Sequence, residues 1–335
     1  MSIDAREWAR KKGGREGAGG GVPPVRPVVE ALFVADLHLW HKAPLSRARE
    51  RCWYAAMERQ LAQLGELRRG LHGPAGPGSA ALVYCGDIFD RYNPPPELVN
   101  WAIKHLPRGL AVPGQHDLPH HRYEDVRKSA YWTLVEAGVL TDLAPGAPQG
   151  RGTLRLWGFP WGAEVQPPPR DGFFGTEVAV VHAYCCTARA SYPGAPDSAY
   201  AAEWRRKLRG YHFAFFGDNH KAFTSSKGDP TVANCGTFLR RKADEADEQP
   251  GAWVLHQDGA LKRHQFDCKE DVLEGKDKGP LLQMKDKANF EVFLHGLQSL
   301  EHAAPDFRAA LIRHMDERGV SDGVRRVVLQ AMGEG

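Results

Sequence analysis

Acidic and histidine side chains stand at the ends of several apolar segments that have the composition of strands. The first pair is Asp36 and His38, directly after the apolar residues 32–35. Residues two positions apart in an extended chain point to the same side, so this carboxylate and this imidazole would point together from the end of the strand. In open α/β sheets, ligands bind at the carboxyl ends of the strands. The pair gains weight only in combination, because Asp-x-His alone is a weak signal.

Four later strand ends carry similar residues. They are Asp87 after residues 80–85, Gln115 and His116 after 110–112, His182 at the end of 177–182, and Asp218 and His220 after 211–216. Alternating strands and helices bring strand ends to one edge of a sheet, so these groups can converge. Aspartate, histidine and amide ligands suit a pair of divalent ions. Two ions about 3.5–4 Å apart can activate a water molecule and bind a phosphate for in-line displacement.

The segments between these clusters have the patterns of the elements that would position them. Helices are expected at 46–67, 97–105, 130–137 and 201–208, and further strands at 154–159, 231–234 and 252–256. This alternation predicts an α/β protein. Residues 240–250 are rich in charge, and we expect them to form an exposed turn.

Composition limits the class of protein. The 335 residues are 42% hydrophobic and 25% charged, which is ordinary for a soluble globular protein. No apolar run approaches the roughly 18 residues needed to span a membrane, and no secretory signal is seen at the N-terminus. Six cysteines without C-x-x-C spacing indicate free thiols and a cytoplasmic location. The net charge of +3 gives no strong field, but a local basic groove could still bind nucleic acid.

Composition also divides the chain into four parts. We expect a disordered, basic and glycine-rich leader at 1–27, a core at 28–266, a charged linker at 267–288 and a C-terminal helical region at 289–335. The C-terminal helices are amphipathic. They would either cover the core or dock a partner protein.

The motifs, taken in order, resemble those of the calcineurin-like metallophosphoesterase family. That family carries D-x-H, G-D-x-x-D, G-N-H-[DE], a lone histidine after a strand, and G-H-x-H, and the resemblance covers residues 32–255. It implies an α/β fold: a four-layer sandwich of two mixed β-sheets flanked by helices, with the C-terminal helices as a small appendage. It also implies a metal-dependent phosphoesterase with two bound divalent ions.

The resemblance also implies a role for each matching position. The first metal would be held by Asp36, His38, Asp87 and His220. The second would be held by Asp87, which bridges the two, and by Gln115, His182 and Asp218. The residues that would act on the substrate are His116 at the leaving oxygen of the phosphate, Asp90 orienting His116, and Arg91 in contact with the phosphate.

Two positions depart from the family pattern, and both fall on the second metal. Gln115 stands where the family has asparagine, and Asp218 where it has histidine. Each still offers an oxygen, and the added carboxylate favours harder ions such as Mn²⁺ or Mg²⁺. We therefore expect Mn²⁺ first, with Mg²⁺, iron and Zn²⁺ as alternatives. The alternative that neither residue binds a metal stays open from sequence alone.

Within the family, short cues resemble the SbcD-type nuclease subunits of double-strand-break repair complexes. The cues are residues 35–39, 86–90 and 234–237. This resemblance implies a DNA nuclease, exo- or endonuclease, with DNA as substrate, an SbcC-like ATPase docked on the C-terminal helices, and a homodimer as a further option. No membrane partner is expected. The alternatives are a small-molecule or nucleotide phosphoesterase, and a catalytically weak subunit that binds or scaffolds DNA ends because of its altered second metal site.

Overall fold

Two six-stranded sheets and the helices that cover them make up the part of the structure that carries the polar strand ends. The computed structural model describes residues 27–187, 199–226, 228–242 and 245–273, together with Met315, Asp316 and Arg325. The chain divides into two compact units, Met1–Lys276 and Asp277–Gly335, and every element named below belongs to the first. The expected leader, apart from residue 27, and nearly all of the expected helical region 289–335 lie outside the described residues. Their character therefore stays a prediction.

The first sheet has six strands in the order β14-β13-β1-β4-β5-β6. They are β1 (Val29–Val34), β4 (Ala81–Tyr84), β5 (Gly109–Ala111), β6 (Leu140–Asp142), β13 (Gly251–His256) and β14 (Leu261–Gln265). The strands β1, β4, β5 and β6 run parallel, with Leu32 beside Leu82 and Val83 beside Leu110. β13 and β14 are antiparallel additions next to β1. The parallel strands therefore end along the same edge.

The second sheet also has six strands, in the order β11-β12-β10-β9-β8-β7. They are β7 (Gln149–Arg151), β8 (Leu154–Phe159), β9 (Thr176–His182), β10 (Phe213–Gly217), β11 (Phe223–Ser225) and β12 (Thr231–Asn234). The strands β8, β9, β10 and β12 are parallel, and Gly217 lies beside His182 at the end of the β9–β10 pair. The edge strands β7 and β11 are antiparallel.

Three apolar clusters join the layers. The inner faces of the two sheets pack together, and Phe33 of β1 stacks on Phe215 of β10 with ring centroids 3.5 Å apart. Alternate residues of β1, such as Leu32 and Val34, pack instead on the outer cluster with the helices. Because both faces of β1 are covered, its residues 31–34 are continuously apolar and do not alternate.

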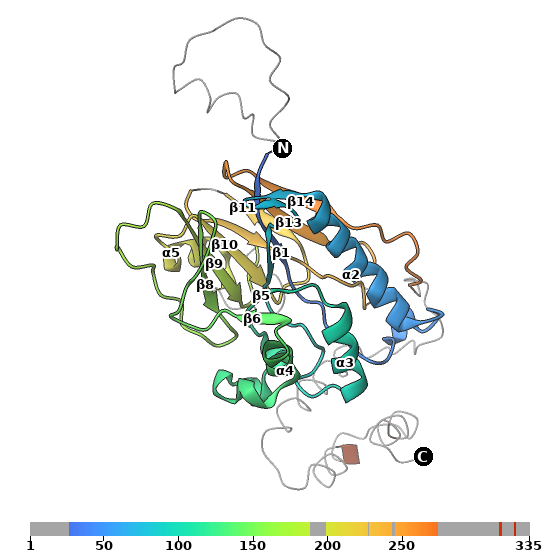
Figure 1. The fold of residues 1–335 in the computed structure, drawn as a ribbon. Helices are drawn as coiled ribbons and strands as arrows, with labels where there is room; N and C mark the ends of the chain where they lie inside the picture. The colour runs from blue at the N-terminus through green and yellow to red at the C-terminus, as the bar shows by residue number, and fades with distance from the viewer. Residues whose placement is uncertain are drawn as a thin grey trace, which may run out of the picture. The chain divides into compact units, whose positions relative to one another are not determined.

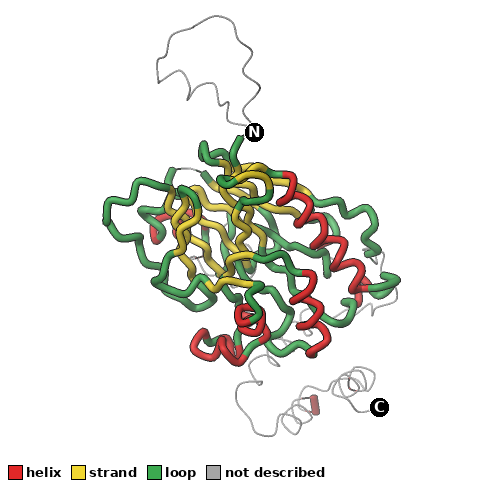
Figure 2. The backbone as a smooth tube through the Cα atoms, viewed as in Figure 1, coloured by secondary structure: helices red, strands yellow, loops and turns green. Residues whose placement is uncertain are grey.

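Helices cover both outer faces, as Figures 1 and 2 show. The helices α2 (Trp53–Gly70), α3 (Pro96–His105) and α4 (Ala130–Glu136) pack on the first sheet, and α5 (Ala201–Lys207) packs on the second. Short elements complete the unit: β2 (His72–Gly73), β3 (Gly76–Pro77), and the 3-10 turns η1 (Leu45–Arg47), η2 (Gln115–Asp117), η3 (Pro119–His121) and η4 (Tyr123–Lys128). The expected sandwich of two mixed sheets flanked by helices is confirmed.

One element differs from its sequence-based prediction. The helix expected from residue 46 begins at Trp53, after the short turn η1. Arg47 donates from Nη1 to the main-chain carbonyl of Arg240 at 2.8 Å, and the Ser46 hydroxyl donates to the carbonyl of Arg241. These two side chains are therefore engaged with a distant loop, which periodicity along the helix could not indicate.

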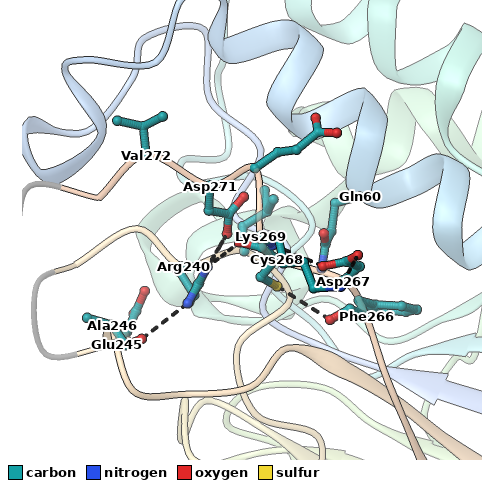
Figure 3. Close-up of polar contacts among 12 residues, drawn as sticks. Gln60, Arg240, Glu245, Ala246, Phe266, Asp267, Cys268, Lys269, Asp271 and Val272 are labelled. Carbon is teal, nitrogen blue, oxygen red and sulfur yellow. Dashed lines mark hydrogen bonds and ion pairs between the residues drawn. The ribbon is translucent and has the colours of Figure 1, made fainter.

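The residues that follow β14 also pack on the core (Figure 3). Asp271 accepts hydrogen bonds from Arg47 at 3.0 Å, from Arg59 of α2 at 3.1 Å and from Arg240 at 3.1 Å. The expected linker 267–288 thus begins with residues that are bound to the core. Among the described residues, no helix has the length and apolar character to cross a membrane.

Candidate active site

The ends of the parallel strands of both sheets meet around one cluster of polar side chains. Asp36 and His38 follow β1, Asp87 follows β4, Gln115 and His116 follow β5, His182 closes β9, and Asp218 and His220 follow β10. Main-chain hydrogen bonds hold the β1 and β4 ends side by side, with Asp36 N on Gly86 O at 3.1 Å and His38 N on Asp87 O at 2.9 Å. The sequence-based expectation that these groups converge is therefore met by the geometry.

Four of these residues have a left-handed backbone. The φ angles are 56° at Asp36, 44° at His38, 53° at Asp87 and 90° at Asp218. Such conformations cost about 1–3 kcal/mol each for residues other than glycine and persist where the surroundings fix them. The Asp218 amide donates to the Asp36 carboxylate at 3.0 Å, which is one of the contacts that fix them. Strain of this kind concentrates at functional sites.

The first group that could hold a metal consists of Asp36, His38 and His220. One ligand atom from each lies within 4.8 Å of the others. The Nε2 atoms of His38 and His220 face each other at 3.2 Å. Two imidazole nitrogens directed at one point, next to a carboxylate, suit a cation between them. The Nδ1 atom of His220 is 2.6 Å from Glu245 Oε1, so its Nε2 lone pair is free for a metal when Nδ1 carries the proton.

The second group consists of Asp36, Asp87 and His182, again with ligand atoms within 4.8 Å. His182 donates from Nδ1 to the carbonyl of Cys85 at 2.6 Å, and its Nε2 lies 3.4 Å from Asp87 Oδ2. Because Nδ1 is the donor, Nε2 is the nitrogen that can face a metal. His182 and both aspartates of this group are fully buried.

Gln115 lies between two of the side chains expected at the second metal. Its Oε1 is 2.8 Å from His182 Nε2, and its Nε2 donates to Asp218 Oδ1 at 2.6 Å. The extra methylene, relative to asparagine, lets the amide span the gap between them. Asp218 is thus brought to the site, but it is bonded to Gln115 and is not part of the metal-ligand groups found among the described residues.

Burial and mutual charge shift the protonation of these groups. Burial raises the pKa of Asp36 to about 6, against the opposing effect of the nearby histidines. Burial, with help from the Arg241 charge, lowers the pKa of His38 to about 3. Burial also opposes the charged form of His182, but Asp87 and Asp36 outweigh it and raise that pKa to about 10.

The donor set fits two divalent cations. Asp87 Oδ2 and His38 Nδ1 are buried without a hydrogen-bond partner among the described residues. Unpaired buried polar atoms are costly, and a bound cation would satisfy the carboxylate oxygen. Asp36 belongs to both groups, and Asp87 Oδ2 lies 3.6 Å from His38 Nε2 as well as 3.4 Å from His182 Nε2, so both carboxylates could serve both ions.

The three residues expected to act on the substrate are placed differently from one another. His116 is held through Nδ1 by the main-chain carbonyl of Asp90 at 2.8 Å, while the Asp90 carboxylate pairs with Arg241 at 2.6 Å and approaches His38 at 3.5 Å. Asp90 therefore contacts His116 through its main-chain carbonyl and not through its carboxylate. Arg91 places its guanidinium 5.6 Å from the Trp40 ring centroid and does not line the cavity described below.

Part of the chain that contains this site matches a known protein family. Residues 30–182 match the family described as Calcineurin-like phosphoesterase. That stretch contains the ends of β1, β4, β5 and β9. It also contains the expected site residues Asp36, His38, Asp87, Asp90, Arg91, Gln115, His116 and His182. The chain has the metallophosphoesterase fold. The match supports membership of the calcineurin-like metallophosphoesterases.

Solved structures similar to this chain include TT1561 of Thermus thermophilus, at 12% identity and a TM-score of 0.41, covering 71% of this chain and 99% of that one. A putative 5'-nucleotidase from Staphylococcus aureus is similar at 10% identity and a TM-score of 0.43, over 79% of this chain and 58% of that one. Phosphopantetheinyl hydrolase from Mycobacterium tuberculosis is similar at 13% identity and a TM-score of 0.36, over 72% and 98%. A search of curated protein sequences finds no match.

A cavity of about 570 Å³ lies beside the candidate metal-ligand residues. Its lining combines the ligand residues with cationic side chains: His38, Pro44, Asp87, Asp90, Gln115, His116, Tyr184, Asp218, Asn219, His220, Lys221, Arg241 and Lys242. Lys221 comes from the turn after β10, and Arg241 and Lys242 come from the loop before β13. A candidate metal site beside a cavity lined by cationic side chains is suited to an anionic substrate.

Several of these residues were not anticipated from the sequence. The expectation of an exposed turn at 240–250 is wrong at two positions, because the side chains of Glu245 and Arg241 are only 3% and 10% exposed. Asp117 is also buried, and it accepts main-chain hydrogen bonds from Ile88, Phe89 and Gly114 at 3.0–3.1 Å. Its place in the expected G-N-H-[DE] motif was visible, but its function as a connector between two loops was not.

Glu245 should affect both metal binding and acid stability. Burial opposes its charge, but His220 and two main-chain amides lower its pKa to about 2. Since the folded pKa lies below the ordinary value of 4.5, its stabilising contribution is present above about pH 4.5 and is lost as the pH falls towards 2. Glu245→Gln should bind Mn²⁺ about 10–100-fold more weakly, as expected for a residue that orients a ligand histidine.

The Glu245→Gln prediction is checked by Mn²⁺ titration and by denaturant unfolding of the metal-free protein from pH 2 to 7. The unfolding free energies of wild type and variant should differ at pH 7 and converge near pH 2. Glu164→Gln, at an exposed position away from the cavity, is the matched control. A constant difference across that pH range would contradict the assignment of the stabilising charge to Glu245.

Gly114→Ala should damage the second metal group. A Cβ atom at residue 114 would lie 2.1 Å from Asp87 Oδ1 and 2.6 Å from His182 Nε2, so both side chains would have to move. We expect bound Mn²⁺ to fall by at least one ion per chain, measured by elemental analysis after gel filtration. Gly150→Ala is the control, because its Cβ would meet nothing within 4 Å. Full metal content in Gly114→Ala would contradict the placement.

Proposed function

We propose that this protein is a metal-dependent phosphodiesterase that acts on DNA. The observation that carries the proposal is the metal-ligand cluster beside a cavity that also presents Lys221, Arg241 and Lys242. A phosphodiester is anionic, and a polynucleotide carries further phosphates on both sides of the bond that is cleaved. Cationic side chains in the cavity lining therefore favour such a substrate over a neutral one. The match to the calcineurin-like family supports the hydrolase class.

Two divalent ions, Mn²⁺ first, are the proposed cofactors. Asp36, His38 and His220 would hold one ion, and Asp36, Asp87 and His182 would hold the other, with Gln115 and Asp218 next to the second. Such ions, when bound, supply Lewis acidity to a phosphate and to a water nucleophile. The carboxylate-rich donor set suits the harder ions.

The protein's own side chains would then position and protonate the substrate. His116 lines the cavity, and its Nδ1 donates to the carbonyl of Asp90, which directs the other ring nitrogen away from Asp90. In the doubly protonated ring, Nε2–H can donate a proton to the leaving oxygen. The hydrogen bond to the main-chain carbonyl fixes the orientation of the His116 ring without placing a carboxylate charge next to it.

The activity is tested with purified full-length protein and Mn²⁺ on single-stranded, double-stranded and hairpin DNA. The proposal expects cleavage of at least one of these, abolished by a chelator and restored by Mn²⁺. Hydrolysis of nucleotides or bis(p-nitrophenyl) phosphate without cleavage of DNA would instead support the small-molecule phosphoesterase. Binding of DNA ends without hydrolysis of any of these substrates would support the non-catalytic scaffold.

We further propose that the enzyme acts as the SbcD-type nuclease subunit of a repair complex. The support is the resemblance of residues 35–39, 86–90 and 234–237 to that group, and the amphipathic pattern of 289–335. The proposed partner is an SbcC-like ATPase that docks on that C-terminal region. Deletion of residues 289–335 should abolish co-purification with such an ATPase and spare hydrolysis of bis(p-nitrophenyl) phosphate. Retained co-purification would contradict the docking site.

A further inference from the structure

The loop between β12 and β13 is attached to the metal-ligand cluster from one side. Glu245, on this loop, contacts His220 Nδ1 through Oε1 at 2.6 Å. Its other oxygen accepts the main-chain N–H groups of Arg241 at 2.6 Å and Lys242 at 3.0 Å. One buried carboxylate thus joins a metal-ligand candidate to the backbone on which Arg241 stands. The position of Arg241 is set relative to His220 by these bonds.

The same loop is attached to the core from the other side, as Figure 3 shows for Arg240. The Arg240 guanidinium donates to the Cys268 carbonyl at 2.7 Å, to Asp271 at 3.1 Å and to the Ala246 carbonyl at 3.2 Å. Its own carbonyl accepts from the fully buried Arg47 at 2.8 Å. Arg240 and Arg241 are neighbours in sequence but face different surroundings, one the core and the other the cavity.

Arg241 brings a cationic side chain to the ligand residues. Its Nη1 donates to Asp90 Oδ1 at 2.6 Å, and Asp90 in turn approaches His38. Its side chain lines the cavity together with Asp87 and His116. Its Nε is buried and has no hydrogen-bond partner among the described residues. A guanidinium has five N–H donors in a rigid fork, so one bond to Asp90 leaves donors for an anion.

We propose that Arg241 binds the phosphate group of the substrate. The assignment rests on the proposed function and names the residue that recognises the phosphate within it. A guanidinium matches two phosphate oxygens in geometry and charge, and such bonds are stronger than those between neutral groups. The contacts of Glu245 and Arg240 fix the loop and with it the Arg241 guanidinium before substrate binds. Binding therefore costs little further conformational entropy. Arg91, which stacks beside Trp40, does not occupy this position.

The test is binding of inorganic phosphate to the Mn²⁺-loaded full-length protein, measured by isothermal titration. Arg241→Met, which keeps the apolar stem and removes the charge, should weaken phosphate binding about tenfold or more. Arg241→Lys, which keeps the charge and loses the fork, should weaken it less. The KM for bis(p-nitrophenyl) phosphate should rise by a factor similar to the loss of phosphate affinity. Arg151→Met on the edge strand β7 should change neither quantity, since residue 151 does not line the cavity.

The measurement separates this assignment from the proposed activity, because phosphate binding needs no turnover. Unchanged phosphate affinity in Arg241→Met, with wild-type Mn²⁺ content and wild-type circular dichroism, would overturn the assignment. A loss seen in Arg91→Met and not in Arg241→Met would also overturn it. If Arg241→Met does not fold, Arg241→Lys decides, since unaltered phosphate affinity and KM in that variant would contradict a forked contact.

Discussion

Asp87→Asn should reduce phosphodiester hydrolysis by at least about 10³-fold and lower the bound Mn²⁺ towards none. The carboxylate lies 3.4 Å from His182 Nε2 and 3.6 Å from His38 Nε2, so, like Asp36, it can face both candidate metal positions. Asparagine keeps the size but removes the charge, and it replaces one carboxylate oxygen by an N–H donor. Two-metal hydrolysis depends on both ions, so losing a shared ligand should cost more than losing a ligand of one ion.

The Asp87→Asn result is measured as kcat on bis(p-nitrophenyl) phosphate and as Mn²⁺ content by elemental analysis. Burial opposes the charged form of Asp87, but His182 and His38 outweigh it and hold its pKa below the ordinary range, so the carboxylate is ionised at neutral pH in the wild type. Asp258→Asn, in the exposed turn between β13 and β14, is the matched control. Retention of two ions and of wild-type kcat in Asp87→Asn would contradict the shared-ligand role.

The double variant Gln115→Asn with Asp218→His should strengthen the binding of Mn²⁺ at the second metal site about tenfold or more. In the wild type, the Gln115 amide spans from His182 to Asp218 and so competes for the atoms that would face the metal. Asparagine is shorter and cannot span that gap, and histidine at 218 restores a nitrogen ligand. Hydrolysis of bis(p-nitrophenyl) phosphate at limiting Mn²⁺ should rise by a similar factor.

The single variants separate the two effects in the same Mn²⁺ titration. Gln115→Asn alone should remove the amide bridge between His182 and Asp218. Asp218→His alone should keep the Gln115 amide and remove the carboxylate that accepts its hydrogen bond. A double variant with lower occupancy than the wild type would contradict the competition, and would indicate instead that Gln115 and Asp218 are the better ligands in this fold. Thermal unfolding of each variant checks that the change lies in metal binding and not in folding.

Much of this site could be predicted from the sequence because its residues stand at strand ends. Asp36, His38, Asp87 and His182 were placed by apolar runs that end in ligand-type side chains, and parallel pairing brings those ends together. Backbone pairing thus determined their convergence. The order of the motifs, not any one of them, indicated the family.

The contacts of the loop before β13 could not be predicted in this way. Arg241 and Asp90 are 151 residues apart, and Glu245 reaches His220 across 25 residues. Such ion pairs have no period along the chain, and a run of charged residues is most often an exposed turn. The contact of Asp90 could not be predicted either. Nothing in the motif G-D-x-x-D indicates that the carbonyl of this residue, and not its carboxylate, contacts His116.

The most direct test of the two-metal site is anomalous scattering at the manganese edge from crystals soaked in Mn²⁺. The account predicts two peaks about 3.5–4 Å apart. One should lie within about 2.5 Å of His38 and His220, the other within that distance of His182, with Asp87 near both. Peaks only elsewhere on the protein, or no peak near these residues at saturating Mn²⁺, would contradict the central claim.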